Sequence, residues 1–141
     1  MIVLDTNVVS EPLRPVPAPE VLAWLDRQPA ETLFLTTISL AELRYGVEAL
    51  PAGKRQAALR ASVEDQIAAL FTGRFLPFDQ AAASCYATVR SRAKASGVAI
   101  AAADSYIAAI AAAHGFAVAT RDETPFRAAG VEVVNPWNSP D

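Results

Sequence analysis

The 141-residue sequence predicts an α/β fold with a parallel sheet that helices cover on both faces. Short apolar runs alternate with segments patterned as helices, which is typical of parallel strands joined by helical crossovers. The apolar runs do not alternate with polar residues, as expected for strands buried on both faces. Hydrophobic residues make up 52% of the chain and charged residues 19%. This composition and length indicate one compact domain over residues 1–141.

Strands are expected at five apolar runs, 2–5, 33–36, 75–78, 116–120 and 131–134. Pro77 cannot donate a ladder hydrogen bond, so the third run is predicted at an edge of the sheet. Helices are expected at roughly 18–27, 39–50, 52–71, 80–96 and 102–114, with a short helical turn near 123–129. A proline-rich loop, PLRPVPAP, is expected before the first full helix, and Gly97, Gly115 and Gly130 look like helix stops.

The charge balance does not by itself indicate a nucleic-acid binder, because the net charge is −3. Ten of the twelve basic residues are arginines, however, and arginine suits bidentate phosphate contacts. Metal ions could also neutralise part of an acidic site. The composition therefore leaves a nucleic-acid substrate open.

The chain carries neither a disulfide pattern nor an evident membrane segment. Cys85 is its one cysteine, which excludes an intrachain disulfide and is expected as a small core residue. Asp5 interrupts the N-terminal apolar run, so no signal peptide is expected. Asp104 interrupts the alanine-rich stretch 98–119, which makes a poor membrane span. We expect a soluble, cytoplasmic protein.

Four carboxylates stand in apolar surroundings. Asp5 ends the first strand run, and Glu42 is the first charge after a neutral stretch in TTISLAELRYG. Asp104 is the only formal charge between Lys94 and Arg121, and Asp122 follows the strand run FAVAT. In open parallel sheets, function collects at the carboxyl ends of the strands.

Each acid also has a local structural explanation. Asp5 could cap the turn after the strand, and Asp122 could cap the short turn that follows it. Ser39 and Glu42 match the S-x-x-E capping box. Asp104 could be a first-turn acid favoured by the helix dipole.

Asp104 fits its local explanation least well, because it lies on an apolar helical face with Ile107, Ile110, Ala111 and His114. A buried carboxylate is costly unless a positive charge meets it, and no lysine or arginine is near in sequence. Either a metal ion or an arginine from elsewhere in the fold would compensate this charge.

Together the four acids predict a site for a hard divalent cation, which prefers carboxylate oxygens. Clustered acids can hold one or two such ions, and the ions activate water for attack on a phosphodiester. No phosphate-binding glycine loop, dinucleotide fingerprint or serine nucleophile elbow is present. The single histidine, His114, precedes Gly115 and suits a helix end or the core, so a zinc site is not expected.

The sequence resembles PIN-domain proteins at four stretches, most closely the VapC/FitB type of bacterial toxin: MIVLDTNVVSE, TTISLAELRYGV, AAADSYIAAIAAAHG and VATRDETPF. The resemblance covers essentially the whole chain. It implies a three-layer α/β/α sandwich with a short, mostly parallel five-stranded sheet. It also implies a metal-dependent endoribonuclease that acts as the toxin of a type II toxin–antitoxin pair.

The resemblance assigns the four family acids, as catalytic and metal-binding residues, to Asp5, Glu42, Asp104 and Asp122. Two polar residues match supporting positions, Asn7 and Thr120. The expected cofactor is Mg²⁺ or Mn²⁺. Water activated by the metal would attack a phosphorus of RNA, leaving a 5′-phosphate and a 3′-hydroxyl.

Further expectations concern partners and substrate contacts. The resemblance implies a homodimer and a cognate antitoxin of VapB/FitA type, with DNA bound only through the antitoxin and no membrane partner. Arg14, Arg44 and Arg121 lie near the acidic motifs and could contact RNA phosphates. They could equally be solvated or paired with acids.

Other functional classes fit less well. A haloacid-dehalogenase-like phosphatase resembles D-x-D at the first motif, where this chain has Asn7 at the third position. The serious alternative is a PIN fold that acts mainly within an antitoxin-containing, DNA-binding autoregulatory complex, with little nuclease turnover. Asp79 precedes a predicted helix and is expected as its N-cap rather than as a fifth site acid.

Overall fold

The computed structural model describes residues 1–138, and five parallel strands form its one sheet. In chain order they are β1 (Ile2–Leu4), β2 (Leu33–Thr36), β3 (Phe75–Leu76), β4 (Ala117–Ala119) and β5 (Val133–Val134). Their order across the sheet is β3-β2-β1-β4-β5, and every neighbouring pair is parallel. The α/β class is confirmed, and β3 lies at an edge as Pro77 predicted.

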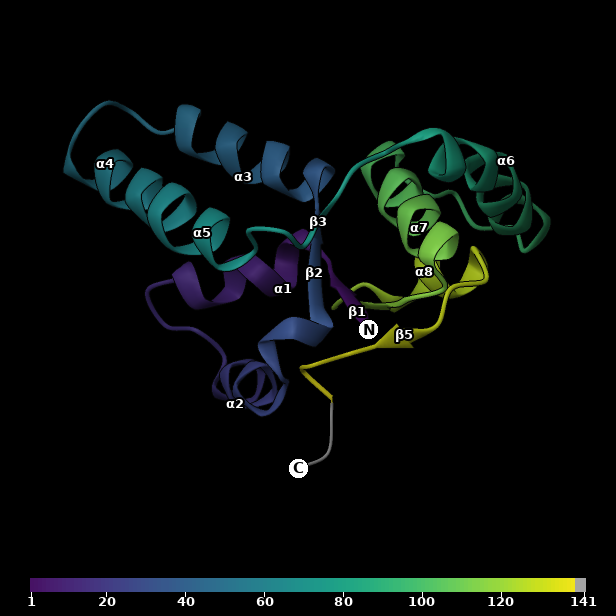
Figure 1. The fold of residues 1–141 in the computed structure, drawn as a ribbon, viewed down its shortest axis with the longest axis horizontal. Helices are drawn as coiled ribbons and strands as arrows, with labels where there is room; N and C mark the ends of the chain where they lie inside the picture. Colours follow the sequence, from purple (N-terminus) through teal and green to yellow (C-terminus); the bar gives the residue numbers. More distant parts are fainter. Residues whose placement is uncertain (139–141) are drawn as a thin grey trace.

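The helices lie in two groups on either side of the sheet (Figure 1). One group comprises α1 (Thr6–Ser10), α2 (Pro19–Arg27), α3 (Thr37–Glu48), α4 (Lys54–Ala61) and α5 (Ala68–Leu70). The other comprises α6 (Gln80–Ala95), α7 (Ala102–His114) and α8 (Glu123–Ala128). Three further helical segments are of other types: the 3-10 turns η1 (Glu11–Leu13) and η2 (Ala30–Thr32), and the π-helix η3 (Ser62–Ile67). The result is the expected three-layer sandwich.

Each face of the sheet has its own hydrophobic core. Val3 and Val118 belong to the core with α6, α7 and α8, whereas Leu4 and Ala119 belong to the core on the α1–α5 side. All four side chains are at most 1% exposed. Because successive residues of a strand point to opposite faces, burial of both faces explains the unbroken apolar runs.

The largest difference from the predicted elements lies after β1. Helix α1 and turn η1 occupy Thr6–Leu13, where no helix was expected. The β-branched residues of this stretch favour strands, and Pro12 suggested a loop. Burial of Val8 and Val9 against the sheet overrides that weak local preference.

The other differences concern element ends. β2 has the expected bounds, whereas the other four strands are shorter than expected, and the third ends at Leu76 rather than at residue 78. The helix expected over 52–71 begins at Lys54 and contains the π-helix η3. Cys85 is half-buried rather than a core residue. His114 lies at the end of α7, one of its two expected places, with its side chain exposed.

Within residues 1–138, none of the helices combines the length and the apolar character needed to cross a membrane.

Candidate active site

Asp5 lies at the carboxyl edge of the sheet, immediately after the central strand β1. It is the N-cap of α1 and not, as expected, the last residue of the strand. Its side chain is 5% exposed. Oδ1 accepts a hydrogen bond from the Thr6 backbone N–H at 2.8 Å, and Oδ2 accepts one from the Thr120 hydroxyl at 2.8 Å. Thr120 follows β4, so the bond joins the ends of two neighbouring strands.

Glu42 lies on α3, which begins directly after β2. The capping-box interpretation is wrong, because Thr36 is the N-cap and its Oγ1 accepts the Ser39 N–H at 3.1 Å. The Glu42 side chain is exposed, and its Oε1 accepts a hydrogen bond from the Thr6 hydroxyl at 2.7 Å. The same hydroxyl lies 2.8 Å from Ser39 Oγ. Thr6 therefore connects Glu42 to the residue that follows Asp5.

Asp104 lies in the first turn of α7 and is half-buried. Ile107 and Ile110, on the same face of the helix, are fully buried. Burial raises the pKa of Asp104 to about 6, and the negative charges of Asp5 and the other two acids add to this shift.

Asp122 stands at the N-cap position of α8, but its side chain accepts no hydrogen bond from the first turn. The capping interpretation therefore predicts the position of Asp122 correctly, but the expected capping hydrogen bond is absent. Its backbone N–H donates to Thr120 Oγ1 at 3.1 Å, while the side chain is exposed. Asn7 lies beside this loop, and its Oδ1 accepts the Arg121 backbone N–H at 3.4 Å. Asp79, by contrast, caps α6 as expected, accepting the Ala82 N–H at 3.0 Å.

The four acids influence one another electrostatically. Burial raises the pKa of Asp5, and the charges of Glu42 and Asp122 raise it further, while the hydrogen bonds from Thr120 and Thr6 oppose the shift. Across the described part of the chain, four ion pairs form, and none involves these acids: Arg14–Glu11, Arg44–Glu64, Arg60–Glu48 and Arg127–Glu123. The site thus carries negative charge that no side-chain cation balances within residues 1–138.

This donor set fits a hard divalent cation, since carboxylate oxygens are its preferred ligands. Over residues 1–138 no three acidic, histidine or cysteine side chains converge as a ready-made ligand set. Both Asp5 oxygens and one Glu42 oxygen accept hydrogen bonds from protein donors. Mg²⁺ usually keeps several waters, so it does not require every carboxylate at direct distance.

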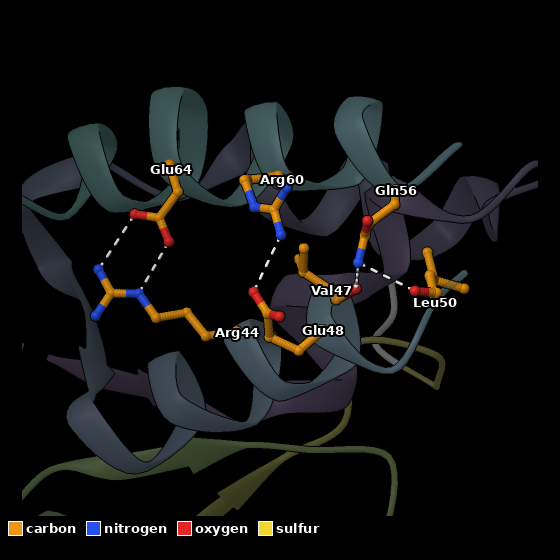
Figure 2. A network of polar contacts seen from close by, with 7 residues as sticks. All are labelled: Arg44, Val47, Glu48, Leu50, Gln56, Arg60 and Glu64. Atoms are coloured by element: carbon orange, nitrogen blue, oxygen red, sulfur yellow. Dashed lines mark hydrogen bonds and ion pairs between the residues drawn. The ribbon is translucent and has the colours of Figure 1, made fainter. Parts of the chain in front are cut away.

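Two of the three arginines near the acidic motifs are engaged elsewhere. Arg14 Nη1 lies 3.0 Å from Oε1 of Glu11, a carboxylate that is only 2% exposed. Arg44 binds both oxygens of Glu64, at 2.9 and 3.2 Å, and reaches from α3 toward the neighbouring helix (Figure 2). Residues two apart on a helix point in nearly opposite directions, so Arg44 lies away from Glu42. The structure does not bring these two arginines to the acids.

Arg121 remains beside the acids, between Thr120 and Asp122. Its side chain is exposed, and its guanidinium carbon lies 5.0 Å from the centre of the Trp137 ring. In the described structure no carboxylate pairs with it.

Sequence reasoning missed the roles of Thr6 and Trp137. Thr6 offered a signal, since it is a polar residue between Asp5 and Asn7 directly after a buried strand. No local sequence pattern predicts the contact of Trp137 with Arg121, because it depends on the path of the chain after β5.

The sequence profile of the PIN domain family matches residues 2–131. The chain belongs to the PIN domain family. This PIN domain is 54% identical over 138 residues to Toxin FitB of Neisseria gonorrhoeae, covering 98% of this chain and 99% of that protein. It is 53% identical over 137 residues to VapC ribonuclease Y4jK of Sinorhizobium fredii, covering 97% and 98% respectively.

A solved structure of FitAB bound to an IR36 DNA fragment contains a chain similar to this PIN domain. The two superpose with a TM-score of 0.95 at 52% identity, over 100% of this chain and 99% of that one. The family and fold implied by the sequence resemblance are therefore confirmed, and the relatives are named as a toxin and a ribonuclease.

Proposed function

We propose that this PIN domain is the toxin of a type II toxin–antitoxin pair and that it acts as a metal-dependent endoribonuclease. The observation that carries the proposal is the group of four mutually interacting carboxylates at the carboxyl edge of the sheet, which no basic side chain of residues 1–138 neutralises. The relatives named as VapC ribonuclease and Toxin FitB support the same reaction and role.

The proposed ligands of Mg²⁺ or Mn²⁺ are Asp5, Glu42, Asp104 and Asp122. The bound cation would supply Lewis-acid activation of water and would offset charge at the phosphate. Thr120 fixes the Asp5 carboxylate, and Thr6 fixes that of Glu42. Asn7 holds α1 against the loop that carries Asp122. Hydrolysis by water predicts products with a 5′-phosphate and a 3′-hydroxyl.

The test is RNA cleavage by the purified protein without its antitoxin, with Mg²⁺ or Mn²⁺ and with or without EDTA. We expect cleavage that EDTA abolishes and that Asp5→Asn lacks. Asp65→Asn is the matched control, because Asp65 is exposed on η3 and should leave cleavage unchanged. If the folded wild type cuts no cellular RNA with either metal, the result favours the alternative, a PIN fold that acts mainly within an antitoxin-containing, DNA-binding autoregulatory complex.

The remaining proposals concern assembly and location. We propose a single-domain, cytoplasmic homodimer that binds a cognate antitoxin of VapB/FitA type and reaches DNA only through it. The similar chain in the DNA-bound FitAB structure supports this arrangement. Co-expression with the product of the adjacent reading frame, followed by measurement of the mass of the complex with and without DNA, tests it.

A further inference from the structure

The segment after β5 is tied to the start of α8 by a chain of hydrogen bonds. Asn135 Nδ2 donates to Glu123 Oε2 at 3.0 Å, and the Trp137 backbone N–H donates to Asn135 Oδ1 at 2.9 Å. Glu123 also accepts from Arg127 Nη2 at 2.8 Å. The half-buried Trp137 ring packs against the core on the α1–α5 side, toward which the chain turns after β5 (Figure 1). The position of Trp137 is thus fixed by both backbone and side-chain contacts.

The Arg121 guanidinium lies over this fixed ring, 5.0 Å from its centre. Its backbone is held as well, because its N–H donates to Asn7 Oδ1 at 3.4 Å. A cation–π contact uses none of the five N–H donors of a guanidinium as a hydrogen bond to another side chain. Arg121 therefore keeps its charge and donors available to another molecule.

The stacking also bears on the neighbouring acids. An arginine one residue from Asp122 and beside other unpaired carboxylates would be expected to pair with one of them. No such pair forms among residues 1–138, and the guanidinium rests on Trp137 instead. Arg121 thus carries its positive charge one residue from Asp122 without forming an ion pair with the acids.

We infer that Trp137 positions Arg121 to bind a backbone phosphate of the RNA strand next to the one that is cut. This inference rests on the proposed ribonuclease function. A polyanion approaching four carboxylates is repelled by them, and a guanidinium one residue from Asp122 offsets part of that repulsion while binding a phosphate in bidentate fashion. Arg121 is then a substrate-binding residue and Trp137 a positioning residue.

The test measures RNA binding separately from cleavage. The probe is a fluorescein-labelled oligouridylate of about 20 nucleotides, titrated with the Asp104→Asn protein in Mg²⁺ so that it stays intact, at several salt concentrations. Adding Arg121→Gln should weaken binding about tenfold, as expected for loss of a charged hydrogen bond. It should also reduce the slope of log K against log salt by about 0.7, the value for one single-strand phosphate. Trp137→Leu should reproduce much of both changes. Trp137→Phe should keep the affinity and the salt slope of the parent protein, because it retains an aromatic face.

Arg60→Gln is the matched control, since Arg60 is exposed and pairs with Glu48 on a different surface. It should leave the salt slope unchanged. In the cleaving protein, Arg121→Gln should raise KM for the same RNA with little change in kcat.

An unchanged affinity and salt slope in Arg121→Gln, or no measurable RNA binding by the parent protein, would overturn the phosphate contact. If Trp137→Leu lowers only the free energy of unfolding, the stack is structural and the positioning role is wrong. The outcome stays separate from that of the proposed function. If the wild type binds RNA with the predicted salt slope but cuts none, only the proposed nuclease activity is contradicted. If the protein cuts RNA and Arg121→Gln leaves cleavage unaffected, only the phosphate contact of Arg121 is contradicted.

Discussion

Two threonine hydroxyls hold two of the four acidic side chains. Thr120 donates to the buried Asp5, and Thr6 donates to Glu42. A buried carboxylate with a fixed donor stays ionised more readily, which is why these bonds oppose the rise in the pKa of Asp5. The two hydroxyls therefore fix the positions of both carboxylates through hydrogen bonds within the protein.

Replacing Thr120 with valine tests this role, because valine keeps the shape and removes the hydroxyl that donates to Asp5 and accepts the Asp122 N–H. We expect Thr120→Val to lower the free energy of unfolding by about 1.5–3 kcal/mol, since a buried charged acceptor loses its partner. Urea unfolding at pH 7 measures the change. Thr124→Val, at an exposed position of α8, should change the stability by less than about 0.5 kcal/mol. Equal effects of the two substitutions would show that the bond to Asp5 contributes little.

Asp104 makes the stability of the metal-free protein depend on pH. Its folded pKa of about 6 lies above the ordinary value of 3.8, so the folded state holds the proton more tightly than the unfolded chain does. This stabilising contribution is complete below about pH 4 and is lost as the pH rises through 6.

Asp104→Asn should therefore raise the stability of the metal-free protein at pH 7 by roughly 1–2 kcal/mol, after allowance for solvent screening. At pH 4 the variant and the wild type should be equally stable. Denaturant unfolding in EDTA at both pH values measures the difference. A large loss of stability at pH 7 would mean that Asp104 makes a structural contact rather than carrying an uncompensated charge.

At this scale the sequence located the acids but not most of their partners. The four carboxylates stood out because apolar residues surround them in sequence. The donor to Glu42, Thr6, is 36 residues away, and only the fold brings the two together. The pairing of Arg44 with Glu64 was likewise hidden, because the two lie 20 residues apart on different helices.

At the scale of elements, the alternation of strands and helices could be predicted, whereas several boundaries could not. Hydrophobic periodicity marks the middle of an element, and local contacts decide its ends. The π-helix η3 lies in a stretch with neither glycine nor proline, so nothing in the sequence distinguishes it from a continuous helix. The central place of β1 was also hidden, because pairing depends on contacts between distant segments.

Two glycines in different backbone conformations give a matched prediction for helices α3 and α7. Gly46 lies within α3, and an added Cβ would meet no atom within 4 Å. Gly115 is the C-cap that follows α7, with a φ of 69° and equally open space around it. Gly46→Ala should stabilise the protein by about 0.5–1 kcal/mol, and Gly115→Ala should destabilise it by about 1–2 kcal/mol. Thermal and urea unfolding measure both, and changes of the same sign would contradict the assignment of these backbone conformations.

For the whole molecule, the acidic site predicts that divalent cations stabilise the fold. A ligand that binds only the folded state adds about 2.7 kcal/mol when its free concentration is 100 times its Kd. Titration with Mg²⁺ or Mn²⁺ should therefore raise the Tm of the wild type, and EDTA should reverse the rise. The matched comparison is Asp5→Asn against Asp65→Asn. The first should respond less than the wild type and the second equally, and identical responses in both would place the cation elsewhere.

The composition and the alternation of elements predicted the fold class of the whole molecule. The family resemblance then predicted the three layers, because the motifs span nearly the entire chain. The order of the strands could not be predicted from the sequence, because it depends on which crossover connections pack best. The course of the chain after β5 followed from no local pattern, and Trp137 was consequently left without a role.

The central position of β1 has a consequence for synthesis of the chain. β1 comes first in the sequence, yet one of its two neighbours is β4, at Ala117–Ala119. At a synthesis rate of 5–20 residues per second, one edge of β1 stays unpaired for on the order of ten seconds before β4 emerges from the ribosome. Asp122 emerges later still, so a nascent chain lacks the assembled acidic site until most of it has been made. The topology thereby keeps the acids of that site from assembling until the chain has been made as far as Asp122.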